Sequence, residues 1–325
     1  MRVAINGMGR IGRLLFRRLM DHPSIEVVAI NDLMDVQNLI YLLKYDSVYG
    51  PLPLSLMFEN KLLVGNKSVT VLNEADPKQL SWNELQVDVV IECTGQFTKK
   101  SLATQHLSAG AKRVLLSTTG SEDIPLMIFG FNEKSYNKEI DVISPGGCMT
   151  NCSVQVINAL SSLHILSAQL NVVHSYTSRQ SLVDAPHKDF RRGRAAAESI
   201  IPVPVDLAQS LERLFPALTG KIAAVTTRVP VLNGALADFT FHVADDINKE
   251  DVNALLKKAA SEHLSGIIAY VEDPLVSLDI KGNAHSAVID GTLTSVVGNQ
   301  VKVFAFFDNE YGFTSRMIDW LMYVK

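Results

Sequence analysis

The sequence is poor in cysteine, has no long apolar run and carries no excess of basic charge. Its three cysteines, Cys93, Cys148 and Cys152, are too few and too irregularly spaced for a disulfide framework, so we expect the reducing cytoplasm. No apolar stretch approaches the roughly 18 residues that span a bilayer, and we expect no signal peptide, because glycines soon interrupt the apolar run after Arg2. The formal net charge is −4 and the pI about 6.1, so we expect neither a membrane nor nucleic acid as a partner.

The composition is that of a globular protein with more than one core. Hydrophobic residues make up 47% of the 325 residues and charged residues 20%, which argues against disorder. A chain of this length exceeds one ordinary core, so we expect two domains. The patterns described below divide the chain into residues 1–147, to which a C-terminal helix at 310–325 returns, and residues 148–309.

The first domain opens with a strand, a glycine-rich turn and a helix. Residues 3–5 are a short apolar run, and residues 6–12 read Asn-Gly-Met-Gly-Arg-Ile-Gly before a helix expected to reach about residue 21. Gly7 permits the tight turn, Gly9 lets the backbone approach a pyrophosphate, and Gly12 lets helix and strand pack closely. Amides at the helix start then face the phosphates.

An acidic residue follows the second strand at the position that a dinucleotide site requires. The apolar run 26–30 precedes Asp32, which lies 20 residues beyond Gly12. A carboxylate there can accept hydrogen bonds from the adenosine ribose, and its charge would repel a 2′-phosphate. We therefore expect NAD rather than NADP; the alternative is a strand-to-helix turn of structural value only.

Two further continuous apolar runs, 87–91 and 113–116, are typical of parallel strands covered on both faces. The turns after them contain Thr94, Gly95 and Ser117, at carboxyl ends of strands, where open α/β sheets bind ligands. The first domain is thus expected to be a Rossmann-type, doubly wound parallel sheet of the α/β class, and these three residues are expected to bind the cofactor.

The second domain begins with a thiol. Gly146 and Gly147 break the chain, and residues 148–163 are expected to form a helix with Cys148 at its N-terminus, where the helix dipole would lower the pKa of the thiol. Cys152 lies one turn further and is expected to be buried. The pair lacks a matching second pair of ligands, so we expect no metal. A thiol, the imidazole of His174 and a nicotinamide together suggest oxidation of an aldehyde through a covalent thioester.

In later segments, apolar and polar residues alternate with a period of two. Residues 237–243 and 301–306 are expected to be strands of an antiparallel sheet, residues 249–264 an amphipathic helix, and residues 313–323 a final helix. The second domain is therefore expected to be α+β.

The ordered motifs resemble those of the glyceraldehyde-3-phosphate dehydrogenase family over essentially the whole chain. The matching segments are 4–13, 92–95, Cys148 with 150–152, 174–177, 187–192, 199–202, 227–230 and 308–312.

This resemblance implies roles by position. Cys148 resembles the nucleophile that adds to the aldehyde carbon, and His174 the base that takes the hydroxyl proton as hydride leaves for the nicotinamide. The Cys148 backbone N–H and the His174 ring would hold the oxyanion. The positions implied to bind the substrate and its phosphate groups are Thr150, Thr177, Arg192 and Arg228. Those implied to bind the cofactor are Arg10 and Ile11 on the pyrophosphate turn, Asp32 on the ribose and Asn309 on the nicotinamide carboxamide.

The resemblance also implies an oligomeric state and a metabolic pathway for this protein. Pro186 falls in the loop that, in the family, borders the cofactor of a neighbouring subunit, so a homotetramer is implied. The implied reaction is the glycolytic oxidation of D-glyceraldehyde 3-phosphate to 1,3-bisphosphoglycerate, which also serves gluconeogenesis. The sister activity on the same scaffold, D-erythrose-4-phosphate dehydrogenase, forms 4-phosphoerythronate without a phosphate cosubstrate and is the alternative.

The chain departs from the family's pattern beside the thiol. Gly147 lacks the hydroxyl that the family's serine would offer to a phosphate, and Met149 replaces a threonine. Residues 203–206, Val-Pro-Val-Asp, replace a loop that normally offers hydroxyl and amide donors. The hypothesis that follows is weakened phosphorolysis of the thioester, or its replacement by hydrolysis. An NAD-binding protein that has lost catalysis is the alternative of another class.

Overall fold

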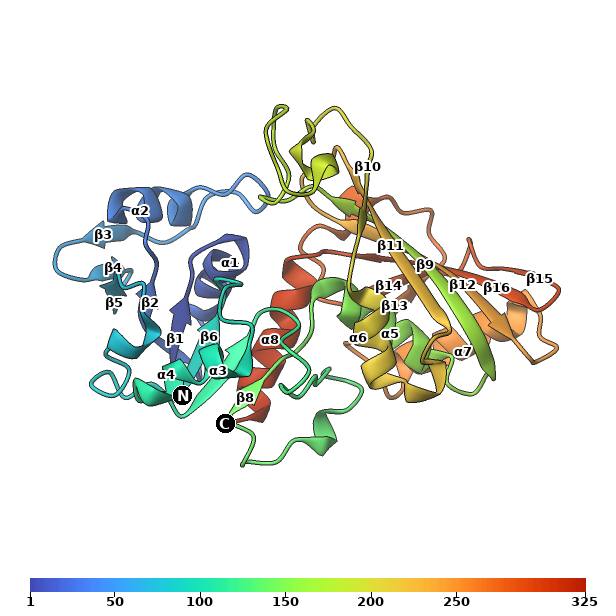
Figure 1. Cartoon of the computed structure of the whole chain (residues 1–325), viewed down its shortest axis with the longest axis horizontal. Helices are drawn as coiled ribbons and strands as arrows, with labels where there is room; N and C mark the ends of the chain where they lie inside the picture. The colour runs from blue at the N-terminus through green and yellow to red at the C-terminus, as the bar shows by residue number, and fades with distance from the viewer. The chain divides into compact units, whose positions relative to one another are not determined.

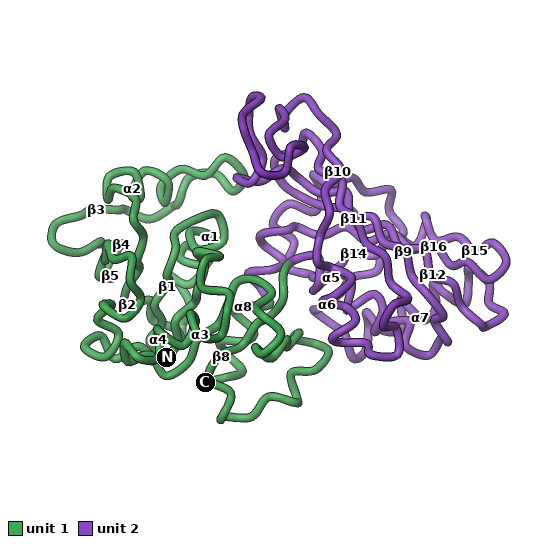
Figure 2. The backbone as a smooth tube through the Cα atoms, in the orientation of Figure 1, with its two compact units in different colours: residues 1–147, 316–325 green, residues 148–315 purple.

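The computed structural model describes all 325 residues, which form two compact units. Unit 1 consists of residues 1–147 and 316–325, and unit 2 of residues 148–315 (Figure 2). The chain leaves unit 1 after Gly147 and re-enters it within the final helix, α8 (Tyr311–Tyr323).

Unit 1 is built on one sheet with the strand order β3-β4-β5-β2-β1-β6-β7-β8 (Figure 1). Its strands are β1 (Arg2–Asn6), β2 (Glu26–Asn31), β3 (Leu56–Phe58), β4 (Leu62–Val64), β5 (Lys67–Leu72), β6 (Val89–Glu92), β7 (Arg113–Leu116) and β8 (Val142–Ile143). Its helices are α1 (Arg10–Leu19), α2 (Val36–Lys44), α3 (Lys100–Ala103) and α4 (Gln105–Ser108), with one-turn helices η1 (Pro77–Gln79) and η2 (Glu133–Ser135). All neighbours from β5 to β8 are parallel, and only β3-β4-β5 is antiparallel. The expected Rossmann-type sheet is confirmed.

Local sequence explains where these elements begin and end. The strands β1 and β6 are buried over residues 3–6 and 89–92, as their continuous apolar runs require. Helix α1 starts after Gly9 and buries Leu14, Leu15 and Leu19. It ends at Leu19, two residues short of the expected position.

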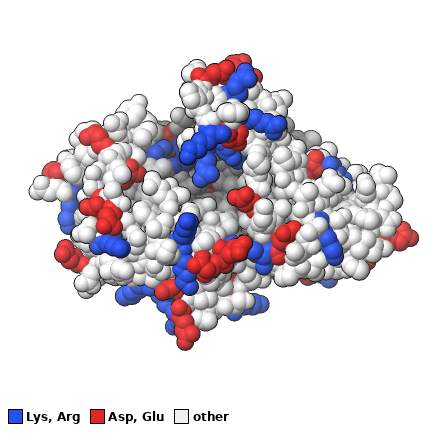
Figure 3. Space-filling view, viewed as in Figure 1, with Lys and Arg blue, Asp and Glu red and all other residues white.

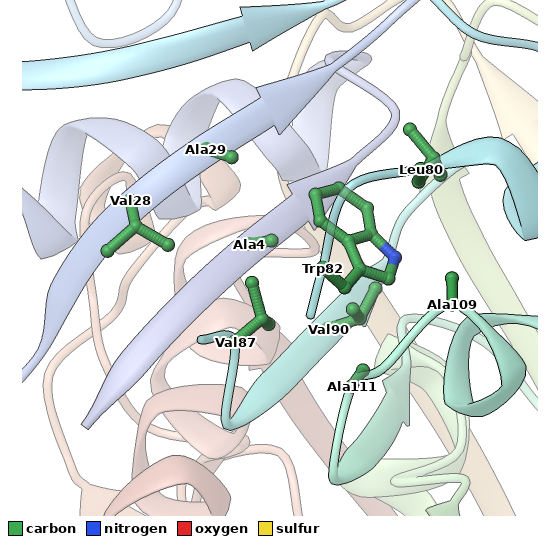
Figure 4. Close-up of a cluster of buried hydrophobic side chains, with 9 residues drawn as sticks. All are labelled: Ala4, Val28, Ala29, Leu80, Trp82, Val87, Val90, Ala109 and Ala111. Carbon is green, nitrogen blue, oxygen red and sulfur yellow. The ribbon is translucent and has the colours of Figure 1, made fainter. Parts of the chain in front are cut away.

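Trp82 is the largest side chain of one core cluster in unit 1 (Figure 4). Its indole is fully buried among small and β-branched residues such as Ala4, Val90 and Ala109, which leave room for it. Burying this ring removes most of its apolar surface from water and stabilises the unit by a few kcal/mol on the usual scale of about 25 cal/mol per Å². The indole N–H donates to Nδ1 of His106 at 3.1 Å, so its one polar atom is satisfied.

Unit 2 is built on a second sheet with the order β10-β11-β9-β12-β16-β14-β13, and β15 pairs with β16. Its strands are β9 (Ile165–Ser175), β10 (Ile201–Pro204), β11 (Ile222–Val229), β12 (Ala235–Val243), β13 (Ile268–Val271), β14 (Ala287–Asp290), β15 (Ser295–Val297) and β16 (Gln300–Phe307). Its helices are α5 (Cys148–Ala159), α6 (Leu207–Leu214) and α7 (Lys249–Ser261), with one-turn helices η3 (Phe190–Gly193), η4 (Pro216–Leu218) and η5 (Ser277–Ile280).

The second sheet is mixed, whereas the sequence predicted an antiparallel one. Most neighbours are antiparallel, but β9 pairs with β11 and β13 with β14 in parallel. A parallel pair needs a crossover connection, and the long segment between β9 and β11, which includes α6, provides one. The alternation visible within single strands could not reveal this crossover.

The helices of unit 2 line one side of this sheet. Helix α5 contacts α6 and α7 and the strands β12, β14 and β16. Nearly all of its residues are buried, so it is a core helix, and it ends at Ala159 instead of at residue 163 as expected. The opposite sheet face carries polar side chains, among them Gln169, Thr240 and Lys302, around two shallow depressions. No helix is both long and apolar enough to cross a bilayer.

Candidate active site

The glycine-rich turn of unit 1 has the backbone geometry that its sequence predicted. Gly7 adopts φ +93°, where a side chain would be strained, and a Cβ there would lie 2.6 Å from the Thr94 nitrogen. A Cβ on Gly12 would lie 2.0 Å from the carbonyl oxygen of Gly7, so helix α1 approaches the turn as closely as glycine allows. A Cβ on Gly9 would meet nothing within 4 Å. Gly9 therefore leaves an open space at the start of a helix, and this space fits a pyrophosphate.

Asp32 lies beside this turn, and its carboxylate is held in place by backbone amides. Oδ2 accepts from the Met8 N–H at 2.6 Å and Oδ1 from the Met34 N–H at 2.9 Å. Ile11 and Arg10 lie in the first turn of α1, but the Arg10 guanidinium forms two hydrogen bonds with Asp46, of 2.5 and 3.2 Å. The side chain of Arg10 is thus engaged by Asp46.

The remaining residues of unit 1 that the sequence predicted to bind the cofactor follow β6 and β7. Thr94 and Gly95 follow β6, with Gly95 at φ +69°, and Ser117 follows β7. Because β1, β2, β6 and β7 are parallel, the residues after them share the carboxyl edge of the sheet. The structure therefore brings together, along one edge, the cofactor-binding residues that the sequence predicted for unit 1.

A buried network behind this edge was missed by the sequence analysis. The Glu92 carboxylate, 2% exposed, accepts from Asn6 Nδ2 at 2.5 Å and from the Thr94 N–H at 2.7 Å, and it contacts His106 Nε2 at 3.1 Å. The Thr94 hydroxyl also donates to it. Glu92 thus fixes the Thr94 turn. The signal in the sequence was an acidic residue within an otherwise apolar strand.

In unit 2 the thiol and the imidazole meet. Cys148 is the first residue of α5, and His174 is the penultimate residue of β9. Cys148 Sγ lies 3.7 Å from His174 Nε2, within the range of a hydrogen bond to sulfur. His174 is 3% exposed, and Cys148 is partly exposed. The pair is therefore a thiol and an imidazole in contact, an arrangement that suits a nucleophile and its base.

Burial decides the protonation states of this pair, against the lowered thiol pKa that the sequence predicted. Desolvation raises the pKa of Cys148 to about 11, although Arg228 and the amides of Met149 and Cys148 itself favour the thiolate. Desolvation, together with the charge of Arg228, lowers the pKa of His174 to about 3. Both shifts favour a neutral thiol beside a neutral imidazole.

Arg228 adjoins both members of the pair. It lies on β11 directly opposite His174 on β9, is 8% exposed, and its Nε has no partner within the protein. Burial, together with the charges of Arg192 and Arg179 and against that of Cys148, lowers the pKa of Arg228 to about 10. Three guanidinium groups close enough to feel one another, with a buried N–H unsatisfied, are typical of an anion site.

The loop after β9 carries the other phosphate-binding candidates. The Thr177 N–H and hydroxyl both donate to Gln180 Oε1, at 2.9 and 3.1 Å, so Gln180, which the sequence analysis missed, positions Thr177. Arg192 lies in η3 and pairs with Asp189 at 3.2 Å. Arg179 is exposed, and its charge acts on Arg228. On the face drawn in Figure 3, Lys and Arg side chains gather over this part of unit 2.

Asn309 is oriented by its carbonyl oxygen. Oδ1 accepts from the Gly234 N–H at 2.8 Å and from the Ser175 hydroxyl at 3.3 Å, and the residue is 8% exposed. This leaves the amide Nδ2 as the donor, which fits the carboxamide oxygen of a nicotinamide. Ser175, a further residue missed by the sequence analysis, also lies 3.4 Å from His174 Nδ1 and so links the two.

The altered segments beside the thiol have a definite geometry. A Cβ on Gly147 would meet nothing within 4 Å, so the hydroxyl that is absent here would have had room. Thr150 is buried in α5. The stretch expected to be a loop at 203–206 begins instead in strand β10, which pairs with β11 and ends at Pro204. Its two prolines, Pro202 and Pro204, lie on an edge strand, where a missing N–H costs no ladder hydrogen bond.

A dinucleotide-binding unit joined to a unit with a paired thiol and imidazole defines an NAD-dependent dehydrogenase that acts on an aldehyde. The comparisons with known proteins agree. The family model described as glyceraldehyde 3-phosphate dehydrogenase, NAD binding domain, matches residues 1–100, and its C-terminal domain counterpart matches residues 147–309. The chain belongs to the glyceraldehyde-3-phosphate dehydrogenase family, as the ordered motifs predicted, and NAD is its cofactor.

Characterised relatives resemble the chain over nearly its whole length. Glyceraldehyde-3-phosphate dehydrogenase 1 of Bacillus subtilis (strain 168) is 43% identical over 327 residues, covering 99% of this chain and 98% of the relative. Glyceraldehyde-3-phosphate dehydrogenase of Geobacillus stearothermophilus is also 43% identical with the same coverage. The enzyme of that name from Mycobacterium avium is 39% identical, covering 98% of this chain and 96% of the relative.

Proposed function

We propose that this chain catalyses the NAD-dependent oxidation of D-glyceraldehyde 3-phosphate to 1,3-bisphosphoglycerate, the glycolytic and gluconeogenic step, through a thioester on Cys148. The observation that carries the proposal is the contact of Cys148 Sγ with His174 Nε2 at 3.7 Å beside the buried Arg228. The names of the relatives support the choice of aldehyde.

The side chains of unit 2 account for the proton movements. His174 Nε2 takes the proton of the Cys148 thiol as Sγ adds to the aldehyde carbon, and the Cys148 N–H and the His174 ring hold the resulting oxyanion. His174 then gives this proton to the oxyanion and takes it back from the hydroxyl as hydride leaves the same carbon, which converts the thiohemiacetal to a thioester. NAD, when bound, supplies the hydride acceptor. Attack of inorganic phosphate on the thioester carbon then releases the acyl phosphate and the Cys148 sulfur.

The binding roles follow the geometry described above. Substrate and phosphate groups are assigned to Arg228, Arg192, Thr177 and Thr150. NAD is assigned to Gly7, Gly9, Arg10, Ile11, Gly12, Asp32, Thr94, Gly95 and Ser117, with Asn309 donating to the nicotinamide carboxamide. The open space at Gly9 and the oriented amide of Asn309 support these assignments.

A cysteine pair provides the decisive experiment. Cys148→Ser should reduce the first-turnover burst of NADH by at least about a thousandfold, because the alcohol is a far weaker nucleophile. Cys152→Ala, one helical turn away and fully buried, should keep the burst, which shows that the loss is not caused by damage to α5. Undiminished NADH formation by Cys148→Ser would refute the thioester and favour an NAD-binding protein without this chemistry.

The open space beside Gly147 favours a second candidate, oxidation of D-erythrose 4-phosphate with hydrolysis of the thioester. Gly147 and Met149 offer no side-chain donor, and the two prolines of β10 offer no N–H, to an attacking phosphate. Steady-state rates on both aldehydes, with and without inorganic phosphate, decide between the candidates. Strict dependence on phosphate would eliminate the hydrolytic one.

We also propose a cytoplasmic homotetramer. All three cysteines are free, which suits a reducing compartment. The loop that contains Pro186 exposes Leu182, Val183 and Phe190 by 68, 73 and 88%, and apolar side chains so exposed are typical of a subunit interface. Light scattering of the purified protein should give the mass of four chains; a monomer would refute the assembly.

A further inference from the structure

His106 lies between Trp82 and Glu92 in the interior of unit 1, and its two ring nitrogens have different partners. The indole N–H of Trp82 donates to Nδ1 at 3.1 Å, and Nε2 lies 3.1 Å from the Glu92 carboxylate. The side chains of His106 and Trp82 are fully buried, and Glu92 is 2% exposed. Because bulk water does not reach these polar groups, each depends on a partner within the protein.

The indole N–H decides the protonation of His106. An indole can only donate, so Nδ1 must carry a lone pair. An imidazolium has a proton on both nitrogens, so a ring that accepts from Trp82 is neutral and has its one proton on Nε2. His106 therefore donates a neutral N–H to Glu92, and the carboxylate carries the only charge of these three side chains.

Four donors converge on the Glu92 carboxylate. Oε2 accepts from Asn6 Nδ2 at 2.5 Å and from His106 Nε2. Oε1 accepts from the Thr94 N–H at 2.7 Å and from the Thr94 hydroxyl. Four donors match the lone pairs of an ionised carboxylate and leave no place for a proton. A buried carboxylate that is fully satisfied in this way has a single, rigid position.

Asn6 is held on its other side by a second asparagine. Its Oδ1 accepts from Asn31 Nδ2 at 2.6 Å, and Asn31 forms hydrogen bonds of 2.9 Å with both the N–H and the carbonyl oxygen of Glu74. A backbone N–H can only donate and a carbonyl can only accept, so neither asparagine amide can turn over without losing a bond. The donors from Asn6 and His106 to Glu92 therefore have fixed directions.

The turn after β6 connects this network to the cofactor edge. Thr94 donates twice to Glu92. Phe97, three residues later, packs edge-on against the His106 ring, with centroids 5.8 Å apart. The same turn lies against the glycine-rich turn, since a Cβ on Gly7 would be 2.6 Å from the Thr94 nitrogen. A displacement of Thr94 would therefore disturb both turns that are assigned to the cofactor.

We propose that Glu92 is a positioning residue for the cofactor, and that His106, whose tautomer is set by Trp82, holds Glu92 in place. Both residues act through Thr94, because their hydrogen bonds keep its turn in the geometry for NAD before NAD binds. A turn that has this geometry only about one tenth of the time would bind NAD about tenfold more weakly. The role rests on the proposed assignment of Thr94 and the glycine-rich turn to the cofactor.

Glu92→Gln keeps the shape of the side chain and replaces one carboxylate oxygen by an NH₂ group. Toward Asn6 and His106 this group would meet two donors that cannot turn, whereas the Thr94 hydroxyl can rotate and accept. The NH₂ group should therefore face Thr94 and leave its backbone N–H without a partner.

Calorimetric titration of Glu92→Gln should show NAD binding at least about tenfold weaker than in the native protein. At saturating NAD the first-turnover NADH burst should stay within about twofold of the native rate, because the thiol site itself is unchanged. A merely structural role would not separate affinity from rate in this way. Unchanged NAD affinity, or a burst that falls at saturating NAD as far as the affinity does, would overturn the proposal.

Two substitutions of His106 test its part. The amide of His106→Gln can accept from Trp82 and donate to Glu92, so this variant should bind NAD within about twofold of the native affinity. His106→Leu can do neither and should bind NAD several-fold more weakly. Equal NAD affinity in the two variants would show that the hydrogen bonds of His106 do not act on the turn.

A carboxylate at the opposite end of β6 provides the matched control. Asp88 accepts from the Arg2 N–H at 2.8 Å and from Lys112 Nζ at 2.7 Å. Asp88→Asn should lower the Tm and leave the NAD affinity within about twofold. A loss of affinity as large as that of Glu92→Gln would show that any weakening of β6 has the same effect, which would overturn the positioning role.

The tautomer of His106 can be measured without NAD by NMR of the full-length protein labelled with ¹⁵N-histidine. The His106 signals are assigned as those that His106→Gln removes. The native protein at neutral pH should have a proton on Nε2 and none on Nδ1. A proton on Nδ1, alone or in an imidazolium, would overturn the proposal. Because this measurement uses native Glu92, it decides even where Glu92→Gln does not fold.

The positioning role and the proposed function fail separately. Unchanged NAD affinity in Glu92→Gln, together with weaker binding in Gly9→Ala, would remove the positioning role and leave the cofactor site in place. A Cys148→Ser protein that still forms NADH would remove the thioester and leave the results on Glu92 and His106 standing.

Discussion

Substitutions at two glycines of the first turn would distinguish a cofactor-binding turn from a turn that has only a structural role. Gly9 and Gly12 lie three residues apart at the start of α1, and neither has a positive φ. An alanine Cβ at Gly9 would meet no atom within 4 Å, whereas one at Gly12 would lie 2.0 Å from the carbonyl oxygen of Gly7. The same methyl group is therefore harmless to folding at one position and a collision at the other.

The magnitudes follow from what each methyl meets. At Gly12 the obstacle is backbone, which must move by more than an ångström, so Gly12→Ala should cost at least about 3 kcal/mol, the upper end of overpacking effects. For a unit of this size that corresponds to a fall in Tm of at least about 6 °C. Gly9→Ala should change stability by less than about 1 kcal/mol, because the lower entropy of the unfolded chain offsets a poorer helix cap.

The assay combines calorimetric unfolding with titration of NAD. Gly9→Ala should bind NAD at least about tenfold more weakly, a loss of 1.4 kcal/mol or more, because the methyl occupies the space assigned to the pyrophosphate. Its thermal unfolding without NAD should match that of the native protein. Unchanged affinity in Gly9→Ala would show that no pyrophosphate lies at this turn, and unchanged Tm in Gly12→Ala would refute the close approach of α1.

Three further predictions concern the thiol site. Burial lowers the pKa of His174 from 6.5 to about 3, so between these pH values only the unfolded chain binds the proton, and the free energy of unfolding falls as the pH falls. In urea unfolding, His174→Gln should therefore lose about 2–3 kcal/mol less than the native protein between pH 6.5 and 4.5. The same pH dependence in both proteins would contradict this prediction. Because the pKa of Cys148 is raised to about 11, its alkylation by iodoacetamide in anion-free buffer should rise about tenfold per pH unit from 7 to 10; a plateau near pH 7 would instead reveal a resting thiolate. Gly147→Ser has room for its side chain and should lower the phosphate KM by at least about tenfold through one charge-assisted hydrogen bond. An unchanged KM would show that the missing hydroxyl does not affect phosphate binding.

Much of unit 1 could be predicted because its signals are local. A buried parallel strand is a continuous apolar run, a glycine-rich turn has a fixed spacing, and an acidic residue follows the second strand, so β1, α1, β2 and Asp32 could be placed within one or two residues. The network around Glu92 could not be foreseen, because Trp82, His106 and Asn6 meet it only after the sheet has assembled.

The sequence by itself determined the chemistry that this protein carries: a dinucleotide turn, a thiol at the start of a helix, an imidazole and several arginines. Only the tertiary structure decided how they act together. Arg228 meets His174 because β9 and β11 pair in parallel with these two residues in register, a contact between residues 54 apart in the chain. The direction of the thiol pKa was likewise decided by packing, since desolvation depends on every atom around Sγ and outweighs the local amides that the sequence could show.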